Sequence, residues 1–239
     1  MKLESVKILK SLEDLSQETC RDVIGVLADI DDTITTEGRL RASAYAMLER
    51  LTNAGLIVIP ITGRPAGWCD MIARFWPVAG IVGENGVFAM RYDHDMRKMR
   101  RMFHANDTTR IESRRKLDAL ANVILDDVSG TALASDQSYR EADLAIDFCE
   151  DVPALPEDQV DRIVAHFHAA GAVAMVSSIH VNGWFGDWDK LTMSKQFLAT
   201  DFGIDLDAHK DKFIFCGDSP NRRTDVWVFP KCLWRSKCR

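Results

Sequence analysis

The chain has 239 residues, 46% of them hydrophobic, and carries a formal net charge of −6 at pH 7. This length and composition can bury a sizeable core, in one large domain or two smaller ones, and the negative charge argues against general binding to nucleic acids or other polyanions. No apolar run approaches the length of a membrane span and the amino terminus lacks a signal-peptide core, so we expect a cytoplasmic protein that binds no membrane.

The first predicted element is a buried strand that ends in acidic residues. Residues 23–28 form an unbroken apolar run, and Asp29, Asp31 and Asp32 follow it. A run without polar alternation is typical of a strand buried on both faces in the middle of a parallel sheet. Asp29 and Asp31 are separated by one residue, so in an extended chain their carboxylates point to the same side. Two hard oxygen ligands at one place would suit Mg²⁺. The alternative is an acidic turn with a local capping role.

A helix and a second buried strand follow in βαβ order. Apolar residues recur at helical spacing over 42–54, and the apolar run 56–61 leads directly into Thr62. A right-handed crossover makes the two strands parallel, which brings Thr62 to the same edge of the sheet as Asp29. The next predicted elements are a helix over 68–75, a strand over 80–82 and a hairpin turn over 83–86.

The middle of the chain has a less regular order of strands and helices, which predicts an α+β module inserted into an α/β core. We place the core in residues 1–87 and 186–239 and the module in residues 88–185. The segment from Thr109 to Glu112 fits a capping box at the start of the first helix of the module. The other elements predicted for the module are strands over 144–148, 172–177 and 179–185 and a helix over 156–170.

The regular pattern resumes at Asp189 with a helix that carries Lys190, and a last buried strand over 213–216 leads into Asp218. Phosphoryl transfer requires positioning and charge neutralisation, and a carboxylate nucleophile, a cation, a hydroxyl and an ammonium form a coherent set for it. The residues that supply this set are Asp29, Asp31, Thr62, Lys190 and Asp218. Local roles are the alternative: a capping hydroxyl for Thr62, an ordinary solvated lysine and a turn-shaping aspartate.

The order of these motifs resembles that of the haloacid dehalogenase (HAD) superfamily. The motifs are Asp29-Ile30-Asp31-Asp32-Thr33, Ile61-Thr62-Gly63-Arg64, Lys190 and Gly217-Asp218-Ser219-Pro220-Asn221, and the resemblance covers about Val23 to Asn221. The insert resembles a type-two cap, and Gly83-Glu84-Asn85-Gly86 is similar to the branch of sucrose-phosphate, trehalose-phosphate and mannosyl-phosphoglycerate phosphatases. The resemblance implies an α/β fold with a Rossmann-like parallel-sheet core and an inserted α+β cap.

The resemblance also implies a role for each motif residue. Asp29 would be the nucleophile and a metal ligand, and Asp31 would be the general acid/base and a ligand through its carbonyl oxygen. Asp218 would complete the Mg²⁺ shell, while Thr62 and Lys190 would hold the phosphoryl oxygens. The residues expected to bind substrate are Gly63, Arg64, Asn85, His180 and Asn182. His180 and Asn182 alternate on one predicted strand of the cap, where strand packing is the alternative role.

The chain departs from the family pattern at Arg222, where an acid normally follows Asn221. A guanidinium in place of an acid changes the local charge by about two units and should weaken Mg²⁺ binding. Residues 222–239 lack helical periodicity, and deletion of one nucleotide after the Asn221 codon permits a reading in which Asn221 is followed by Asp-Ala-Pro. We hypothesise that the tail from Arg222 is a frameshift product, and we expect a core without its last helix and strand and with weak activity.

These observations predict a Mg²⁺-dependent phosphatase that hydrolyses a small phosphorylated sugar or related metabolite through an aspartyl-phosphate. A non-catalytic protein that binds a phosphorylated ligand is one alternative, favoured by Arg222, and a phosphomutase of the same superfamily is another. A run of basic residues precedes the first helix of the module. These residues either bind further anionic groups of the substrate or form a solvent-exposed face of the module. Its residues are Arg91, Arg97, Lys98, Arg100 and Arg101.

Overall fold

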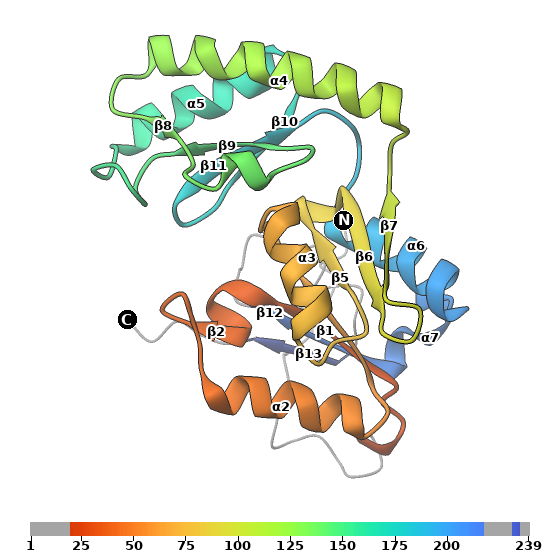
Figure 1. The fold of residues 1–239 in the computed structure, drawn as a ribbon. Helices are drawn as coiled ribbons and strands as arrows, with labels where there is room; N and C mark the ends of the chain where they lie inside the picture. The colour runs from red at the N-terminus through yellow and green to blue at the C-terminus, as the bar shows by residue number, and fades with distance from the viewer. Residues whose placement is uncertain (1–19, 218–230, 235–239) are drawn as a thin grey trace, which may run out of the picture.

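The computed structural model describes residues 20–217 and 231–234, which form an α/β core and a smaller module above it (Figure 1). The core is built on a seven-stranded sheet in the order β13-β12-β1-β4-β5-β6-β7. Its strands are β1 (Gly25–Asp29), β4 (Ile57–Ile61), β5 (Ile81–Gly83), β6 (Phe88–Asp93), β7 (Lys98–Phe103), β12 (Phe213–Gly217) and β13 (Lys231–Trp234). Its helices are α2 (Ala42–Asn53), α3 (Ala66–Phe75), α6 (Lys190–Phe202) and α7 (Leu206–His209).

Strand β1 lies in the middle of this sheet, as its unbroken apolar sequence predicts. It runs parallel to both neighbours, and Leu27 is level with Ile59 of β4 on one side and with Phe215 of β12 on the other. All five residues of β1 are buried. The carboxyl ends of β1, β4 and β12 therefore meet at one edge, where Asp29 follows the last apolar residue of β1.

Helices cover both faces of the core sheet. On one face, Leu48 of α2 and Ile72 of α3 pack in one buried cluster with Val26 and Val58 of the central strands. On the other face, Leu27 and Ile59 pack in a second cluster with residues of α6. Alternate residues of β1 thus enter different clusters, because successive side chains of a strand point to opposite faces. The expected α/β fold with a largely parallel central sheet is confirmed.

The first strands after the hairpin turn belong to the core sheet. Gly83 is level with Phe88, and β6 and β7 extend the sheet in antiparallel fashion beyond β5. Asn85 (φ 56°) and Gly86 (φ 103°) both adopt a left-handed conformation, which reverses the chain within the short turn η3 (Glu84–Gly86). We expected the module to begin at residue 88, whereas the hydrogen bonds keep residues 88–103 in the core sheet.

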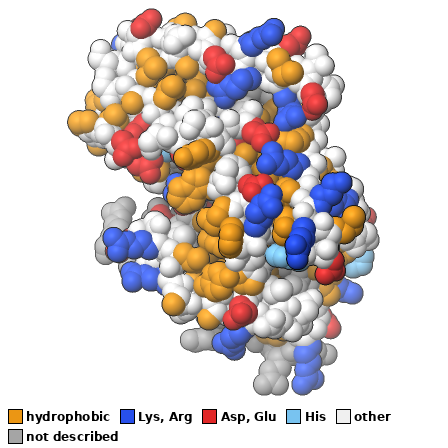
Figure 2. All heavy atoms as spheres, viewed as in Figure 1, with side chains coloured by type: hydrophobic (Ala, Val, Ile, Leu, Met, Phe, Trp, Pro, Cys, Tyr) orange, Lys and Arg blue, Asp and Glu red, His pale blue; other side chains and the backbone are white. Residues whose placement is uncertain are grey.

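Much of the basic run on β6 and β7 is neutralised within the protein. Arg91 and Arg100 form ion pairs with Asp201 at the end of α6, and Arg101 forms ion pairs with Asp70 and Glu141. Figure 2 shows basic and acidic side chains alternating where the module meets the core. These contacts favour a structural role for Arg91, Arg100 and Arg101 over the binding of further anionic groups.

The module consists of an antiparallel sheet covered by two helices. The sheet has the order β10-β11-β9-β8. Its elements are α4 (Asp107–Asp127), β8 (Ala132–Leu133), β9 (Leu144–Asp147), α5 (Glu157–Ala169), β10 (Val173–Val176) and β11 (His180–Trp184). Helix α4 begins earlier than predicted, because Asn106 rather than Thr109 is the N-cap and its side chain accepts a hydrogen bond from the backbone N–H of Thr109 at 2.9 Å.

Part of the tail forms a strand of the core. Residues 231–234 pair in parallel with β12, and Ile214 is level with Lys231. We expected the core to lack its last strand, which is wrong for these four residues, since the sequence Lys-Cys-Leu-Trp forms the strand β13 at the edge of the sheet. Asp218 and Arg222, with the rest of the tail, lie outside the described residues.

Three cysteines of the described core and module, Cys20, Cys69 and Cys149, are free thiols. Burial raises the pKa of Cys69 well above its usual range, which keeps this residue an unreactive part of the core. Among the described helices, none is both long enough and apolar enough to cross a bilayer.

Candidate active site

A buried ion pair joins the end of β1 to the start of α6. The ammonium nitrogen of Lys190 lies 3.3 Å from each carboxylate oxygen of Asp29 and 3.4 Å from the carbonyl oxygen of Ile61. Only 8% of the Asp29 side chain and 7% of the Lys190 side chain are exposed. Two charges removed from water in this way require one another, because an isolated buried charge is strongly unfavourable. The structure thus brings together residues that are 161 positions apart in the sequence.

The position of Lys190 depends on close packing between two backbones. Asp189 caps α6 by accepting a hydrogen bond from the N–H of Thr192 at 2.6 Å. The turn η3 packs against this helix start so tightly that a Cβ atom on Gly86 would lie 2.1 Å from the carbonyl oxygen of Asp189. Since Gly86 also has a φ of 103°, only glycine satisfies both the conformation and the contact at this point.

We expect G86A to unfold more easily than G203A, its matched control at the other end of α6. Gly203 has a comparable left-handed φ of 67°, but nothing lies within 4 Å of the Cβ atom it would gain. G203A should lose about 1 kcal/mol of the free energy of unfolding through backbone strain alone. G86A should lose about 1–3 kcal/mol more through overpacking against Asp189. Urea unfolding of both variants measures the difference, and equal losses would refute the close approach.

The loop after β4 places Thr62 beside this pair. Thr62 is fully buried, and its hydroxyl oxygen accepts a hydrogen bond from the N–H of Arg64 at 3.0 Å. Its backbone carbonyl accepts from the N–H of Asn85 at 3.1 Å, and the Asn85 side chain lies against Gly63, where a Cβ atom would meet its amide oxygen at 3.0 Å. Asp29 is level with Ile61, so Thr62 follows at the same sheet edge. Thr62, Gly63 and Asn85 therefore form one loop cluster next to the ion pair.

Asp31 and Arg64 face one another across this edge. The Arg64 guanidinium donates to the Asp31 carboxylate at 2.9 Å from Nη2 and at 3.2 and 3.3 Å from Nε. The same guanidinium lies 4.9 Å from the centre of the Trp68 ring. Burial acts to lower the pKa of Arg64, but the Asp31 carboxylate outweighs burial and raises it. The left-handed φ of 55° at Asp32 turns the chain directly after Asp31.

The two predicted substrate-binding residues of the module have partners within the module. The amide nitrogen of Asn182 donates to Asp143 at 3.0 Å, and His180 Nε2 lies 2.9 Å from a carboxylate oxygen of Glu150. Both side chains are buried in β11, and burial lowers the pKa of His180. These contacts agree with the alternative role in strand packing, while Glu150, whose side chain is 35% exposed, carries the more accessible polar group.

The oxygen atoms near Asp29 suit a hard cation only in part. Within residues 20–217 and 231–234, no three acidic, histidine or cysteine side chains surround a common point. The carboxylate of Asp31 is directed to Arg64. The atom of Asp31 that could bind a metal beside Asp29 is therefore its backbone carbonyl oxygen. Strand β12 ends at Gly217, next to the end of β1, and the predicted third ligand, Asp218, lies outside the described residues.

Glu84 is a buried acid that the sequence analysis placed only in a turn. Its carboxylate accepts hydrogen bonds from four backbone N–H groups. The donors are Ala66 in the core at 2.9 Å and, in the module, Glu141 at 2.8 Å, Ala142 at 2.7 Å and Asp143 at 3.2 Å. The sequence offered one signal, a charged residue in a turn between two apolar segments, but nothing local identifies the donors.

The buried position of Glu84 predicts a pH dependence of stability. Burial, and then the charge of Asp143, raise the pKa of Glu84 from its ordinary 4.5 to about 8. Between these values the native chain binds more protons than the unfolded chain, so the free energy of unfolding should fall as pH rises. E84Q removes the titrating proton and should flatten this slope between pH 5 and pH 8 in urea unfolding. The exposed acid Glu112 offers a control, since E112Q should keep the parent slope; identical slopes in both variants would contradict the assignment.

No family model matches the chain, and no curated protein sequence matches it. Solved structures match it in fold. The Thermoplasma acidophilum 0175 structure is 18% identical and covers 88% of this chain and 84% of its own, with a TM-score of 0.64. A sugar phosphatase of HAD subclass IIB is 11% identical, with coverages of 91% and 89% and a TM-score of 0.62. The carboxyl-terminal domain of the Candida albicans trehalose synthase regulatory protein is 11% identical, with coverages of 96% and 89% and a TM-score of 0.65.

At these identities the comparison shows a shared fold. The chain shares its fold with a solved sugar phosphatase of the HAD superfamily, and the alignment spans most of both chains.

Proposed function

We propose that the chain is a phosphoric monoester hydrolase of the HAD superfamily that forms an aspartyl-phosphate on Asp29. The observation that carries this proposal is the contact between Asp29 and Lys190 at the carboxyl edge of a parallel sheet. A carboxylate nucleophile needs a positive charge beside it when it approaches a phosphate, because two negative groups otherwise repel one another. The fold neighbours described above support the same class of reaction.

In the proposed first step, an oxygen of Asp29 forms a bond to phosphorus while the bond from phosphorus to the leaving oxygen breaks. Lys190 neutralises charge on Asp29 and on the transferred phosphoryl group. Thr62 Oγ1 already accepts a hydrogen bond from the N–H of Arg64, so its own proton is available for donation to a phosphoryl oxygen. The leaving oxygen requires a proton, which Asp31 would supply as general acid.

In the second step, water attacks phosphorus and the bond between the Asp29 oxygen and phosphorus breaks, which releases inorganic phosphate. Asp31, now without its proton, would accept a proton from this water. The Arg64 guanidinium donates to the Asp31 carboxylate at 2.9 Å, so this contact would have to open before Asp31 transfers a proton.

We propose that the Asp29 carboxylate, the Asp31 carbonyl oxygen and Asp218 would hold a Mg²⁺ ion, since all are hard oxygen ligands. When bound, the ion would neutralise negative charge as the phosphate meets Asp29. Arg222, close to Asp218 in the sequence, opposes a cation by its charge. We therefore propose that the tail from Arg222 weakens activity.

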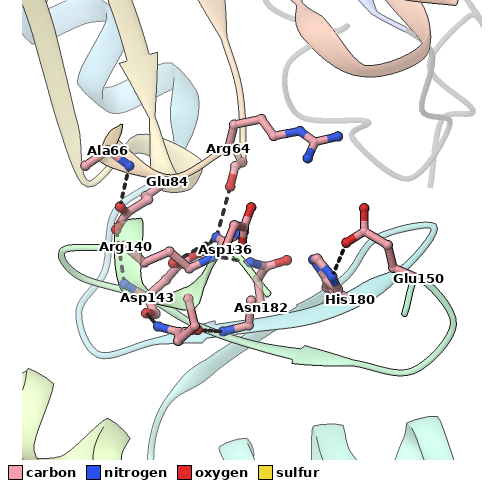
Figure 3. A network of polar contacts seen from close by, with 12 residues as sticks. Arg64, Ala66, Glu84, Asp136, Arg140, Asp143, Glu150, His180 and Asn182 are labelled. Carbon is pink, nitrogen blue, oxygen red and sulfur yellow. Dashed lines mark hydrogen bonds and ion pairs between the residues drawn. The ribbon is translucent and has the colours of Figure 1, made fainter. Parts of the chain in front are cut away.

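The proposed substrate is a small phosphorylated sugar or a related metabolite. One fold neighbour is a sugar phosphatase, and the module presents polar side chains such as Glu150 toward Arg64 in Figure 3. A non-catalytic protein that binds a phosphorylated ligand is the second candidate, favoured by Arg222. A phosphomutase would share the same motifs and would return the phosphoryl group to a sugar.

A panel of phosphorylated sugars, assayed for release of inorganic phosphate with Mg²⁺, tests the proposal. The parent chain is compared with a chain whose residues from Arg222 are replaced by the alternative reading, so that Asn221 is followed by Asp-Ala-Pro. We expect phosphate release from the repaired chain and a slower release from the parent. An isomerised product would identify a mutase, and ligand binding without turnover in the repaired chain would identify a binding protein. Equal rates in the two chains would refute the role given to the tail.

A further inference from the structure

A buried polar cluster joins the inserted module to the loop that carries Thr62 (Figure 3). The Arg140 guanidinium donates to the carbonyl oxygen of Gly63 at 3.2 Å and to both carboxylate oxygens of Asp143 at 3.0 Å. Its Nε donates to Asp136 at 3.2 Å. The Arg140 side chain is 3% exposed and Asp143 is fully buried. Each of these charges therefore depends on the others for its stability in the interior.

Glu84 makes the reciprocal connection from the core to the module. Its carboxylate binds the N–H of Ala66 at the start of α3 and three successive N–H groups of residues 141–143. Glu84 directly precedes Asn85, whose N–H binds the carbonyl oxygen of Thr62. Two hydrogen-bonded connections thus run between residues 140–143 and the loops at residues 62–66 and 84–86.

These connections add to the two places where the chain crosses between core and module, which follow β7 and β11. Both crossings pass close to the turn that carries Glu84, since the N–H of His104 donates to the carbonyl oxygen of Val87 at 3.0 Å and Asp189 packs against Gly86. Glu84 and Arg140 extend this attachment to Ala66 and Gly63. The module is therefore held to the core over a wider base than the two crossings alone provide.

We propose that Glu84 and Arg140 are positioning residues that fix one edge of the module to the loops carrying Thr62 and Asn85. The restraint itself rests on the contacts above. Its effect on turnover rests on the proposed phosphatase function.

Hydrogen exchange measured by mass spectrometry on the full chain tests the restraint without any assay of activity. Above pH 8, where the parent carboxylate is ionised, E84Q places an amide NH₂ where two backbone N–H groups donate, so at least two of the four hydrogen bonds are lost. We expect exchange at residues 141–143 to accelerate about tenfold, with no change in β9 and β11. R140M should accelerate exchange at residues 62–66, and R140K should restore part of the protection.

The control is R162M, which breaks the ion pair between Arg162 and Asp127 on the surface of the module and should change exchange in neither segment. Unchanged exchange at residues 141–143 in E84Q and at residues 62–66 in R140M would overturn the proposal. Uniform acceleration through the whole module would also overturn it, because that result indicates general destabilisation. R140M serves as the independent variant if E84Q does not fold.

Kinetic constants separate positioning from a purely structural role. If the repaired chain releases phosphate, R140M should raise KM more than it lowers kcat, and R140K should recover most of the KM. Equal loss of kcat in R140M and R140K with unchanged KM would contradict positioning. If the repaired chain releases no phosphate, the proposed function fails while the exchange data still decide whether Glu84 and Arg140 fix the module.

Discussion

D29N is expected to reduce the release of phosphate by about a thousandfold or more, the scale for loss of a nucleophile. Asparagine keeps the size of Asp29 and can still accept hydrogen bonds from Lys190 and from the N–H of Ile30, so the fold should survive. The amide cannot form the bond to phosphorus. Initial rates with Mg²⁺, in the chain with the repaired tail, measure the effect.

The matched control for D29N is D95N, which alters an exposed acid between β6 and β7. It should leave the rate unchanged, because Asp95 lies on the surface outside the loop cluster. Circular dichroism and urea unfolding establish that both variants are folded. A D29N rate within tenfold of the parent would exclude Asp29 as the nucleophile.

K190M is expected to reduce turnover by about a hundredfold or more, as removal of one preorganised charge does in other active sites. It should also lower the free energy of unfolding by about 3–5 kcal/mol, because the buried Asp29 carboxylate loses its ion pair with Lys190. The double variant D29N/K190M removes both charges and should be more stable than K190M. This recovery is the signature of a buried pair.

Lys195 on the same helix provides the control for K190M. It forms an ion pair with Asp207 at 2.8 Å, but its side chain is 36% exposed. K195M should therefore change stability by less than about 1 kcal/mol and leave turnover intact. Independent, additive effects of D29N and K190M on stability would contradict the coupling between these residues.

The core could be predicted from the sequence because its signals are local. The apolar runs before Asp29 and Thr62 mark central strands, and parallel βαβ order alone brings their carboxyl ends to one edge. The contact between Lys190 and Asp29 then follows from the start of α6 at this edge. Asp218 belongs to the same prediction and remains a prediction, since it lies outside the described residues.

The connection between core and module could not be predicted in the same way. Nothing near Glu84 in the sequence indicates that residues 141–143 supply its hydrogen-bond donors. The interpretation of His180 as a substrate contact rested on the alternation of residues along a strand. This alternation predicts the face of the sheet on which a side chain lies, but it does not predict that Glu150 is the neighbour of His180. The boundary at residue 88 was set by a change in pattern, whereas the pairing of β6 with β5 depends on the left-handed turn at Asn85.

The most direct measurement is the identification of the phosphorylated residue during turnover. The repaired chain is mixed with a phosphorylated sugar and Mg²⁺, quenched within the first turnover and reduced with borohydride, which converts an aspartyl-phosphate to homoserine for peptide mass spectrometry. We predict homoserine at position 29 and none in D29N. Modification of another residue, or phosphate release by D29N at the parent rate, would contradict the assignment of Asp29 as the residue that receives the phosphoryl group.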